Sequence, residues 1–290
     1  MKDKKQIELT IGLKRFYRRL KSKEKRKRRR RVQHLHHIYT LSRTGGDISY
    51  ENLVKEFLPI NIGYLLSCEK SDFFIDKLLK LKINNDGDFL VPAEFSIIDF
   101  PKESYRFIQE VTAALILQKY QIININYKNC IRADLGAQVL LDIILKDIIT
   151  FFKTLRQIKP KYAQVKEING TNFKNDAIKK LLFSVGSPAI HMNKTVYFKD
   201  IIPYKLCIHD RESHIDPIKI IEKKDIDTTT LVDYVIECLK RLNKKLTPEK
   251  LDNLCVVISE ILINAEEHSS TKYRFSIGYF HEIQEDGKHY

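Results

Sequence analysis

Hydrophobic and polar positions alternate with two different periods through the middle of the chain. Helical spacing of apolar residues predicts helices at 102–120, 134–152 and 175–185. Runs rich in β-branched and aromatic residues predict extended segments or strands at 89–100, 121–127, 162–168 and 195–210. Because helix and strand alternate over about 110 residues, the pattern predicts an α/β fold in which helices cover a sheet.

The N-terminal third has helical spacing only. Residues 10–42 contain no Gly or Pro after Gly12 and predict one long helix or a helix with a frayed middle. Gly45 and Gly46 interrupt it, and Asp47 or Ser49 is placed to cap a second amphipathic helical segment. That segment covers residues 49–83 and ends at the turn sequence NNDGDF, residues 84–89.

The C-terminal region predicts two helices followed by a strand. A polar stretch at 211–227 separates it from the α/β region, and a helix is predicted at 228–246. Thr247 and Pro248 are favourable at the N-cap and first position of the next helix. A strand at 272–283 and a hairpin turn at 285–287 follow. The predicted divisions of the chain are a basic helical arm at 1–44, a helical segment at 45–88, an α/β domain at 89–222 and a C-terminal domain at 223–290.

Basic charge is concentrated at the N-terminus. The formal net charge is +14. Residues 1–43 contain 17 Lys or Arg and 3 acidic residues, so the rest of the chain holds 34 of each sign and is neutral. The densest run, RKRRRR, would contact phosphates of nucleic acid or an anionic membrane surface, and the alternative is a solvated arm. Its members are Arg26, Lys27, Arg28, Arg29, Arg30 and Arg31.

Several classes of protein are excluded by composition. The five cysteines are scattered without a C-x-x-C pair, which indicates neither a disulfide framework nor a zinc cluster. The N-terminus lacks the apolar core of a signal peptide, and no apolar run approaches the length of a membrane span. A cytoplasmic protein without a membrane span is therefore predicted.

Three polar residues recur at intervals of four in the last predicted helix. Glu260, Asn264 and His268 form one stripe along it. One interpretation is a structural stripe that is hydrogen-bonded inside a core, and the other is the metal-binding and water-activating edge of a nucleotide site. Apolar residues are expected to cover the remaining inner surface of this helix: Leu254, Val257, Ile258, Ile261, Leu262 and Ala265.

The segment SEILINAEEHSS resembles the N-box of the histidine-kinase/gyrase-type (GHKL) ATPases, whose pattern is E-x-x-x-N-A-x-E-H. The resemblance implies that Glu260 orients or deprotonates a water and that Asn264 binds the Mg²⁺ that bridges the ATP phosphates. It places Glu267 and His268 near the phosphates, and it lets Ala265 pack closely against a sheet. It also implies that residues 223–290 are the first helices and strand of an α/β-sandwich ATPase domain with ATP and Mg²⁺ as cofactors.

The downstream loops of that family are missing from this sequence. No D-x-G-x-G motif or second Gly-rich loop follows His268, and Asp286-Gly287 has the pattern of a turn between strands. We therefore expect the front part of a longer protein or a degenerate copy, with weak ATP binding. ATPase or kinase activity is expected only if the chain continues beyond residue 290.

Residues 121–148 resemble the STAS domain of anti-sigma-factor antagonists, where a strand, a loop and an apolar helix carry a phosphorylatable serine. At that loop this chain has no hydroxyl, and Asp134 follows Arg132 and Ala133. Asp134 is either an N-cap or a carboxylate that mimics phosphate.

Together these features predict an ATP-binding regulatory protein that uses Mg-ATP binding or hydrolysis to switch an interaction with a protein partner, with a homodimer as one arrangement. The alternative is a nucleic-acid-associated binding module that acts through the basic arm without catalysis.

Overall fold

A computed structural model describes most of the chain after residue 48. The described residues are 33, 37, 40, 49–67, 86–118, 120–162, 167–186, 196–210, 217–267, 273–282, 284–285 and 288–289. Contacts divide the chain into two compact units, residues 38–205 and residues 1–37 with 206–290. Each unit is described separately below.

A three-stranded parallel sheet forms the centre of the 38–205 unit. The strands are β1 (Asp88–Leu90), β3 (Ile122–Asn126) and β5 (Glu167–Thr171), in the order β1-β3-β5. Beyond the ends of β1 and β3, the chain continues into a short second parallel pair, β2 (Glu94–Phe95) and β4 (Arg132–Ala133). In register, Asn124 lies between Asp88 and Asn169, which places all three side chains on one face of the sheet.

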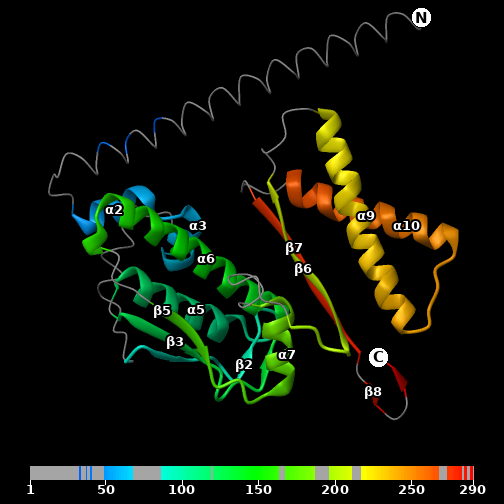
Figure 1. Ribbon diagram of the computed structural model, residues 1–290, viewed down its shortest axis with the longest axis horizontal. Helices are drawn as coiled ribbons and strands as arrows, with labels where there is room; N and C mark the ends of the chain where they lie inside the picture. The colour runs from blue at the N-terminus through cyan, green and yellow to red at the C-terminus, as the bar shows by residue number, and fades with distance from the viewer. Residues whose placement is uncertain are drawn as a thin grey trace, which may run out of the picture. The chain divides into compact units, whose positions relative to one another are not determined.

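Two helices cover the opposite face of this sheet (Figure 1). They are α5 (Pro101–Ile116), between β2 and β3, and α6 (Leu135–Ile158), between β4 and β5. Parallel strands added in one direction by right-handed crossovers place their helices on the same face, and α5 contacts α6. Ile123 and Ile125 of β3 point into the core under these helices and are 0% and 4% exposed.

The first helices of the unit pack onto α5 and α6. They are α2 (Tyr50–Phe57) and α3 (Ile60–Ser67). The Tyr50 hydroxyl donates to the carbonyl of Ile116, and Asn61 donates to Asp147 at 2.6 Å. Helices α2 and α3 of the helical segment predicted at 45–88 thus pack against the α/β region, while residues 68–85 lie outside the described residues. Ser49 caps α2, as predicted, by accepting from the N–H of Asn52 at 3.3 Å.

Two of the predicted extended segments differ in extent from the strands that form. The strand predicted at 162–168 begins only at Glu167, and a short 3₁₀ turn, η1 (Pro160–Tyr162), precedes it. The Asn-Gly pair in β5 is typical of turns, so pairing with β3 overrides the local preference. After α7 (Asp176–Val185), the segment at 195–210, predicted as a strand pair or one extended segment, contains one described strand, β6 (Ile201–Asp210).

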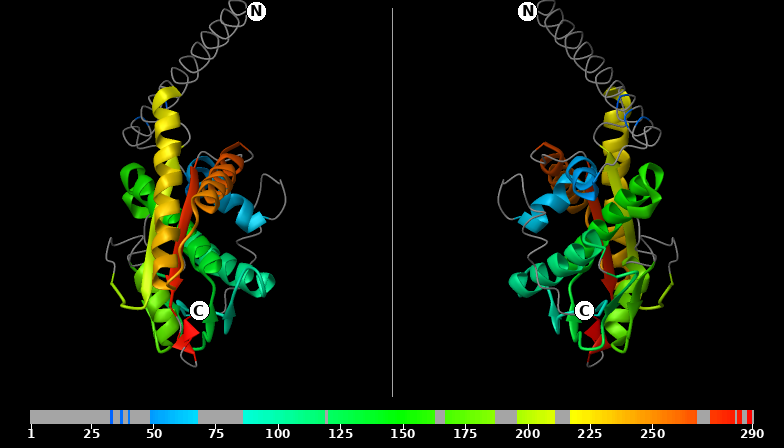
Figure 2. Two further views of the ribbon diagram at one scale, coloured as in Figure 1. Left: turned by 90° about the vertical axis from the view of Figure 1, so that its right-hand side faces the viewer. Right: turned by 90° about the vertical axis from the view of Figure 1, so that its left-hand side faces the viewer.

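The other unit contains two helices that lie against each other (Figure 2). The helices are α9 (Pro217–Arg241) and α10 (Pro248–Glu267). The helix predicted at 228–246 is wrong in its bounds, because α9 begins at Pro217, inside the polar stretch 211–227, and ends at Arg241. Strand β7 (Tyr273–His281) pairs with β6, within which the division between the units falls. Strand β8 (Gln284–Glu285) pairs antiparallel with β9 (Lys288–His289), while residues 286–287 of the predicted turn lie outside the described residues.

Helices and small sheets together confirm a mixed α/β fold. The finer STAS-like and ATPase-like layouts stay predictions. Among the described residues, no helix is both long enough and apolar enough to cross a membrane.

Candidate functional site

The helix that carries Glu260 and Asn264 begins as the sequence predicts. Pro248 occupies its first position, and the Thr247 hydroxyl accepts from the N–H of Lys250 at 3.4 Å. Proline suits this position because the first N–H groups of a helix have no intrahelical acceptor. Successive side chains of a helix are rotated by about 100°, so the face on which each residue of α10 lies follows from its position along the helix.

One face of α10 packs on α9. Ile258 and Leu262 are 7% and 8% exposed and contact Val232 of α9, which is 4% exposed. Partly buried side chains surround this small core: Leu231, Val235, Ile236, Leu251, Leu254 and Cys255. On α10 these contacts fall at positions 251, 254, 255, 258 and 262, so the buried stripe follows one narrow face of the helix.

Glu260 and Asn264 lie on a different, exposed face of α10. Val257 and Ile261 share that face and are 54% and 60% exposed, and Ala265 is exposed as well. The expectation that Val257, Ile261 and Ala265 cover the inner surface is therefore wrong, because α9 contacts a narrower stripe than the apolar pattern allows. A structural stripe buried in a core does not describe Glu260 and Asn264.

The exposed face combines a carboxylate with an amide one helical turn apart. Four residues correspond to a rise of about 6 Å along a helix, so Glu260 and Asn264 can contact one small ligand. A carboxylate can accept a proton from water, and an amide oxygen is a neutral ligand for a hard cation. The described residues contain no group of three or more His, Cys, Asp or Glu placed to hold a metal, so a cation here would depend on ligand oxygens as well.

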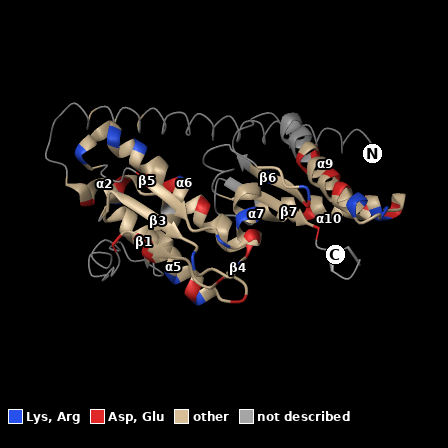
Figure 3. Ribbon diagram, turned by 60° about the horizontal axis from the view of Figure 1, so that its bottom comes forward, with Lys and Arg blue, Asp and Glu red and all other residues tan. Residues whose placement is uncertain are grey.

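Other predicted site residues cannot be placed. The helix α10 ends at Glu267, whose side chain lies outside the described residues, as does His268. The basic run from Arg26 to Arg31 also lies outside them. In the described chain, acidic and basic residues both occur along α5 and α9 (Figure 3). This mixture agrees with the neutral charge of the chain after residue 43.

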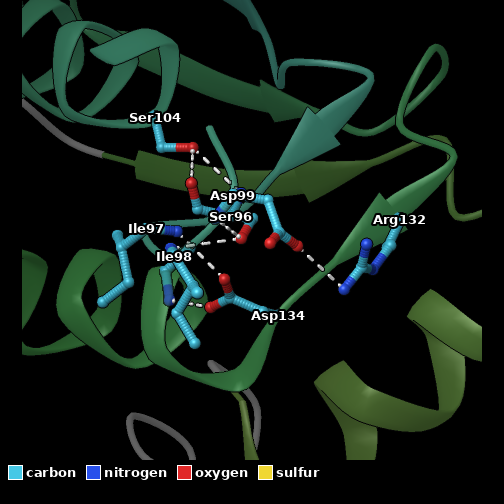
Figure 4. Close-up of polar contacts among 8 residues, drawn as sticks. Ser96, Ile97, Ile98, Asp99, Ser104, Arg132 and Asp134 are labelled. Atoms are coloured by element: carbon cyan, nitrogen blue, oxygen red, sulfur yellow. Dashed lines mark hydrogen bonds and ion pairs between the residues drawn. The ribbon is translucent and has the colours of Figure 1, made fainter. Parts of the chain in front are cut away.

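The second candidate residue, Asp134, joins two segments of the 38–205 unit (Figure 4). Its Oδ1 accepts from the N–H of Ala137 at 2.6 Å, which makes it the N-cap of α6. Its Oδ2 accepts from the N–H of Ile97 at 2.9 Å, in the loop between β2 and α5. The N-cap interpretation is confirmed, and both carboxylate oxygens are engaged with the chain's own backbone.

Two serines hold the loop that Asp134 contacts. The buried Ser96 hydroxyl accepts from the N–H groups of Ile98 and Asp99 at 3.2 and 3.0 Å. The buried Ser104 hydroxyl accepts from the Ser96 N–H and donates to the Ser96 carbonyl, both at 2.9 Å. At the edge of the loop, Arg132 pairs with Asp99 at 3.0 Å, with both side chains partly exposed.

One buried polar network was not predicted from the sequence. The Tyr127 hydroxyl donates to Gln138 at 2.8 Å, and Gln138 donates to Asp142 at 3.1 Å. Burial, and then the charge of Asp142, raise the pKa of Tyr127 well above its usual value. The sequence did contain a sign of this network, because Gln138 and Asp142 are two polar residues spaced by four in an apolar helix. Glu260 and Asn264 show the same spacing.

The chain was compared with protein-family models, with curated proteins and with solved structures, and none of the three comparisons found a match. What the exposed face of α10 does must therefore be inferred from its own residues and their geometry.

Proposed function

We propose that the chain is an ATP-binding regulatory protein in which Glu260 and Asn264 form the phosphate-facing edge of a Mg-ATP site. The observation that carries the proposal is the shared exposed face of α10, where both polar groups are open to a ligand while Ile258 and Leu262 face α9. The N-box resemblance supplies the chemistry of that ligand.

The donor set fits a magnesium–phosphate ligand. Mg²⁺ prefers oxygen ligands and keeps several waters, so one protein amide together with phosphate oxygens is sufficient coordination. Asn264 would contribute that amide oxygen, and Glu260 would orient a water or accept its proton. The bound ion would reduce the negative charge of the phosphates. Binding would switch the interaction with a protein partner, since the exposed Val257 and Ile261 border the same face.

Magnesium-dependent nucleotide binding tests the role of Asn264. Isothermal titration with ATP should show affinity that increases when Mg²⁺ is added. In the presence of Mg²⁺, the Asn264→Ala variant should bind ATP at least about tenfold more weakly than the wild type, which corresponds to about 1.4 kcal/mol of binding free energy. Asn253→Ala is the matched control, because Asn253 is another exposed amide on α10, about 16 Å away along the axis. An equal loss in both variants would contradict the site.

Hydrolysis tests the role of Glu260 separately. If the chain turns over ATP, Glu260→Ala should abolish phosphate release and leave nucleotide binding in place, because a base acts on water and not on the ground-state ligand. Asp252→Ala removes another exposed carboxylate of α10 and should leave turnover unchanged. Equal turnover by wild type and the Glu260 variant would refute Glu260 as the base.

The concentration of all excess charge in residues 1–43 favours a second candidate function, a nucleic-acid-associated module without catalysis. Affinity for a DNA or RNA duplex should then fall steeply with salt and disappear when residues 1–43 are removed. Nucleic-acid affinity that survives the truncation would contradict this candidate.

A further inference from the structure

The outer edge of β5 carries backbone N–H and carbonyl groups that pair with no other described strand. The Glu167 N–H donates to the Gln121 carbonyl, and the Thr171 carbonyl accepts from the Tyr127 N–H. In a parallel ladder, residues that bond to one neighbour alternate with residues that face away from it. The backbone of Glu167, Asn169 and Thr171 therefore faces β3, and the N–H and carbonyl groups of Ile168 and Gly170 point away from the sheet.

Nothing in the described part of the chain pairs with that edge. Strand β5 has β3 as its sole partner among the described strands. Along the strand, Glu167, Asn169 and Gly170 are exposed, and Ile168 and Thr171 are partly exposed. The five described residues of β5 include no proline and no lysine, although these are the usual means of preventing edge pairing.

The outward-facing N–H and carbonyl groups of β5 can pair with the same groups of a second copy of the strand. Two antiparallel copies that cross at Asn169 place Ile168 of one opposite Gly170 of the other. Such a pair exchanges both of its backbone hydrogen bonds, so the free N–H and carbonyl of Ile168 and Gly170 are all satisfied in both copies. No register shift is needed, because the two residues lie symmetrically about Asn169.

The side chains allow the same arrangement. Gly170 brings no side chain, and the place that its Cβ would take is filled by the Phe173 ring of the same copy. The Ile168 side chain of the other copy packs on that copy's own core and would lie opposite the Gly170 backbone. Glu167 would lie opposite Thr171, so no like charges face each other. On the two-fold axis, Asn169 would lie opposite itself, where amides can both donate and accept.

We propose that two copies of this chain pair antiparallel through β5 about Asn169, which joins the two three-stranded sheets into one of six strands. A single five-residue strand pair buries less surface than a standard stable interface. The dimer should therefore be concentration-dependent, with a dissociation constant between micromolar and millimolar. The pairing rests on β5 alone and does not depend on nucleotide binding by α10.

Opposite charges at Asn169 test the proposal directly. Sedimentation velocity of the full chain should show a monomer–dimer equilibrium as the concentration increases. Asn169→Lys and Asn169→Asp should each weaken the dimer by at least about tenfold, since two like-charged residues then face each other across the axis, with their Cα atoms about 4.5 Å apart. An equimolar mixture of the two variants should restore dimers, because opposite charges then meet.

The exposed Asn169 side chain makes no hydrogen bond in the described chain, so both variants should fold. Gly170 is unsuitable for substitution, because a Cβ there would lie 2.7 Å from Cζ of Phe173. Asn124→Lys serves as the control, since Asn124 lies beside Asn169 on the same face but on the central strand. A wild type that stays monomeric up to millimolar concentration would overturn the proposal, as would a dimer that neither Asn169 variant weakens.

Discussion

At the scale of single residues, Asp134 shows how one carboxylate can stabilise two segments. It accepts from Ala137 at the start of α6 and from Ile97 in the loop before α5. Gly136 allows this approach, since a Cβ there would lie 3.0 Å from the end of the Ile97 side chain. The loop position is thus fixed by hydrogen bonds to a helix N-terminus, where a negative charge is also favourable.

Replacing Asp134 should therefore lower the free energy of unfolding more than removing an N-cap that contacts only its own helix. Asp134→Ala loses both bonds and should reduce the free energy of unfolding by about 2–3 kcal/mol. Asp134→Asn keeps one acceptor for Ala137 and should lose about half as much. Ser49→Ala is the control, because Ser49 makes only one bond to its helix, and about 1 kcal/mol is expected. Urea unfolding measures all three, and an equal loss for Asp134→Ala and Ser49→Ala would contradict the bridging role.

At the scale of elements, α10 exposes part of the apolar surface that its sequence carries. Ile258 and Ile261 are one turn apart on the same helix, yet they are 7% and 60% exposed. Periodicity predicted the helix and its cap, but it could not distinguish these two residues, because the width of the contact depends on α9. For the same reason, the sequence predicted the Glu260–Asn264 stripe and not the face on which it lies.

The two isoleucines of α10 provide a matched test of the helix orientation. Ile258→Ala should destabilise the α9–α10 pair by about 2–4 kcal/mol, because it leaves a cavity against Val232. Ile261→Ala should change stability by only about 0.5 kcal/mol. Amide hydrogen exchange of α9 and α10 measures both effects, and a larger loss of protection in the Ile261 variant would show that the helix faces the other way.

Strand positions were harder to predict than helices in this chain. Helices α5 and α7 begin within a residue of their predicted starts, since Pro101 and the Asn175 cap define them locally. Strand β5, with its Asn169-Gly170 pair, has turn-like composition and takes its place only through its register with β3. The unpaired edge of β5 could not be inferred before that register was known.

At the scale of the whole molecule, the chain combines a basic N-terminal segment with a remainder that carries no net charge. The charge of +14 belongs to residues 1–43, and the units carry both signs of charge. A partner bound by the basic segment would therefore be anionic, whereas the α10 face offers apolar and polar groups without excess positive charge. The cytoplasmic location and the existence of a protein partner stay predictions.

Hydrogen–deuterium exchange with and without Mg-ATP tests the central claim most directly. If the exposed face of α10 binds the phosphates, peptides that cover residues 257–268 should become protected when ATP and Mg²⁺ are added together. The protection should be weaker with ATP alone and absent in Asn264→Ala, while Asn253→Ala behaves as wild type. Unchanged exchange in α10 at saturating Mg-ATP, or protection that Asn264→Ala retains in full, would contradict the account.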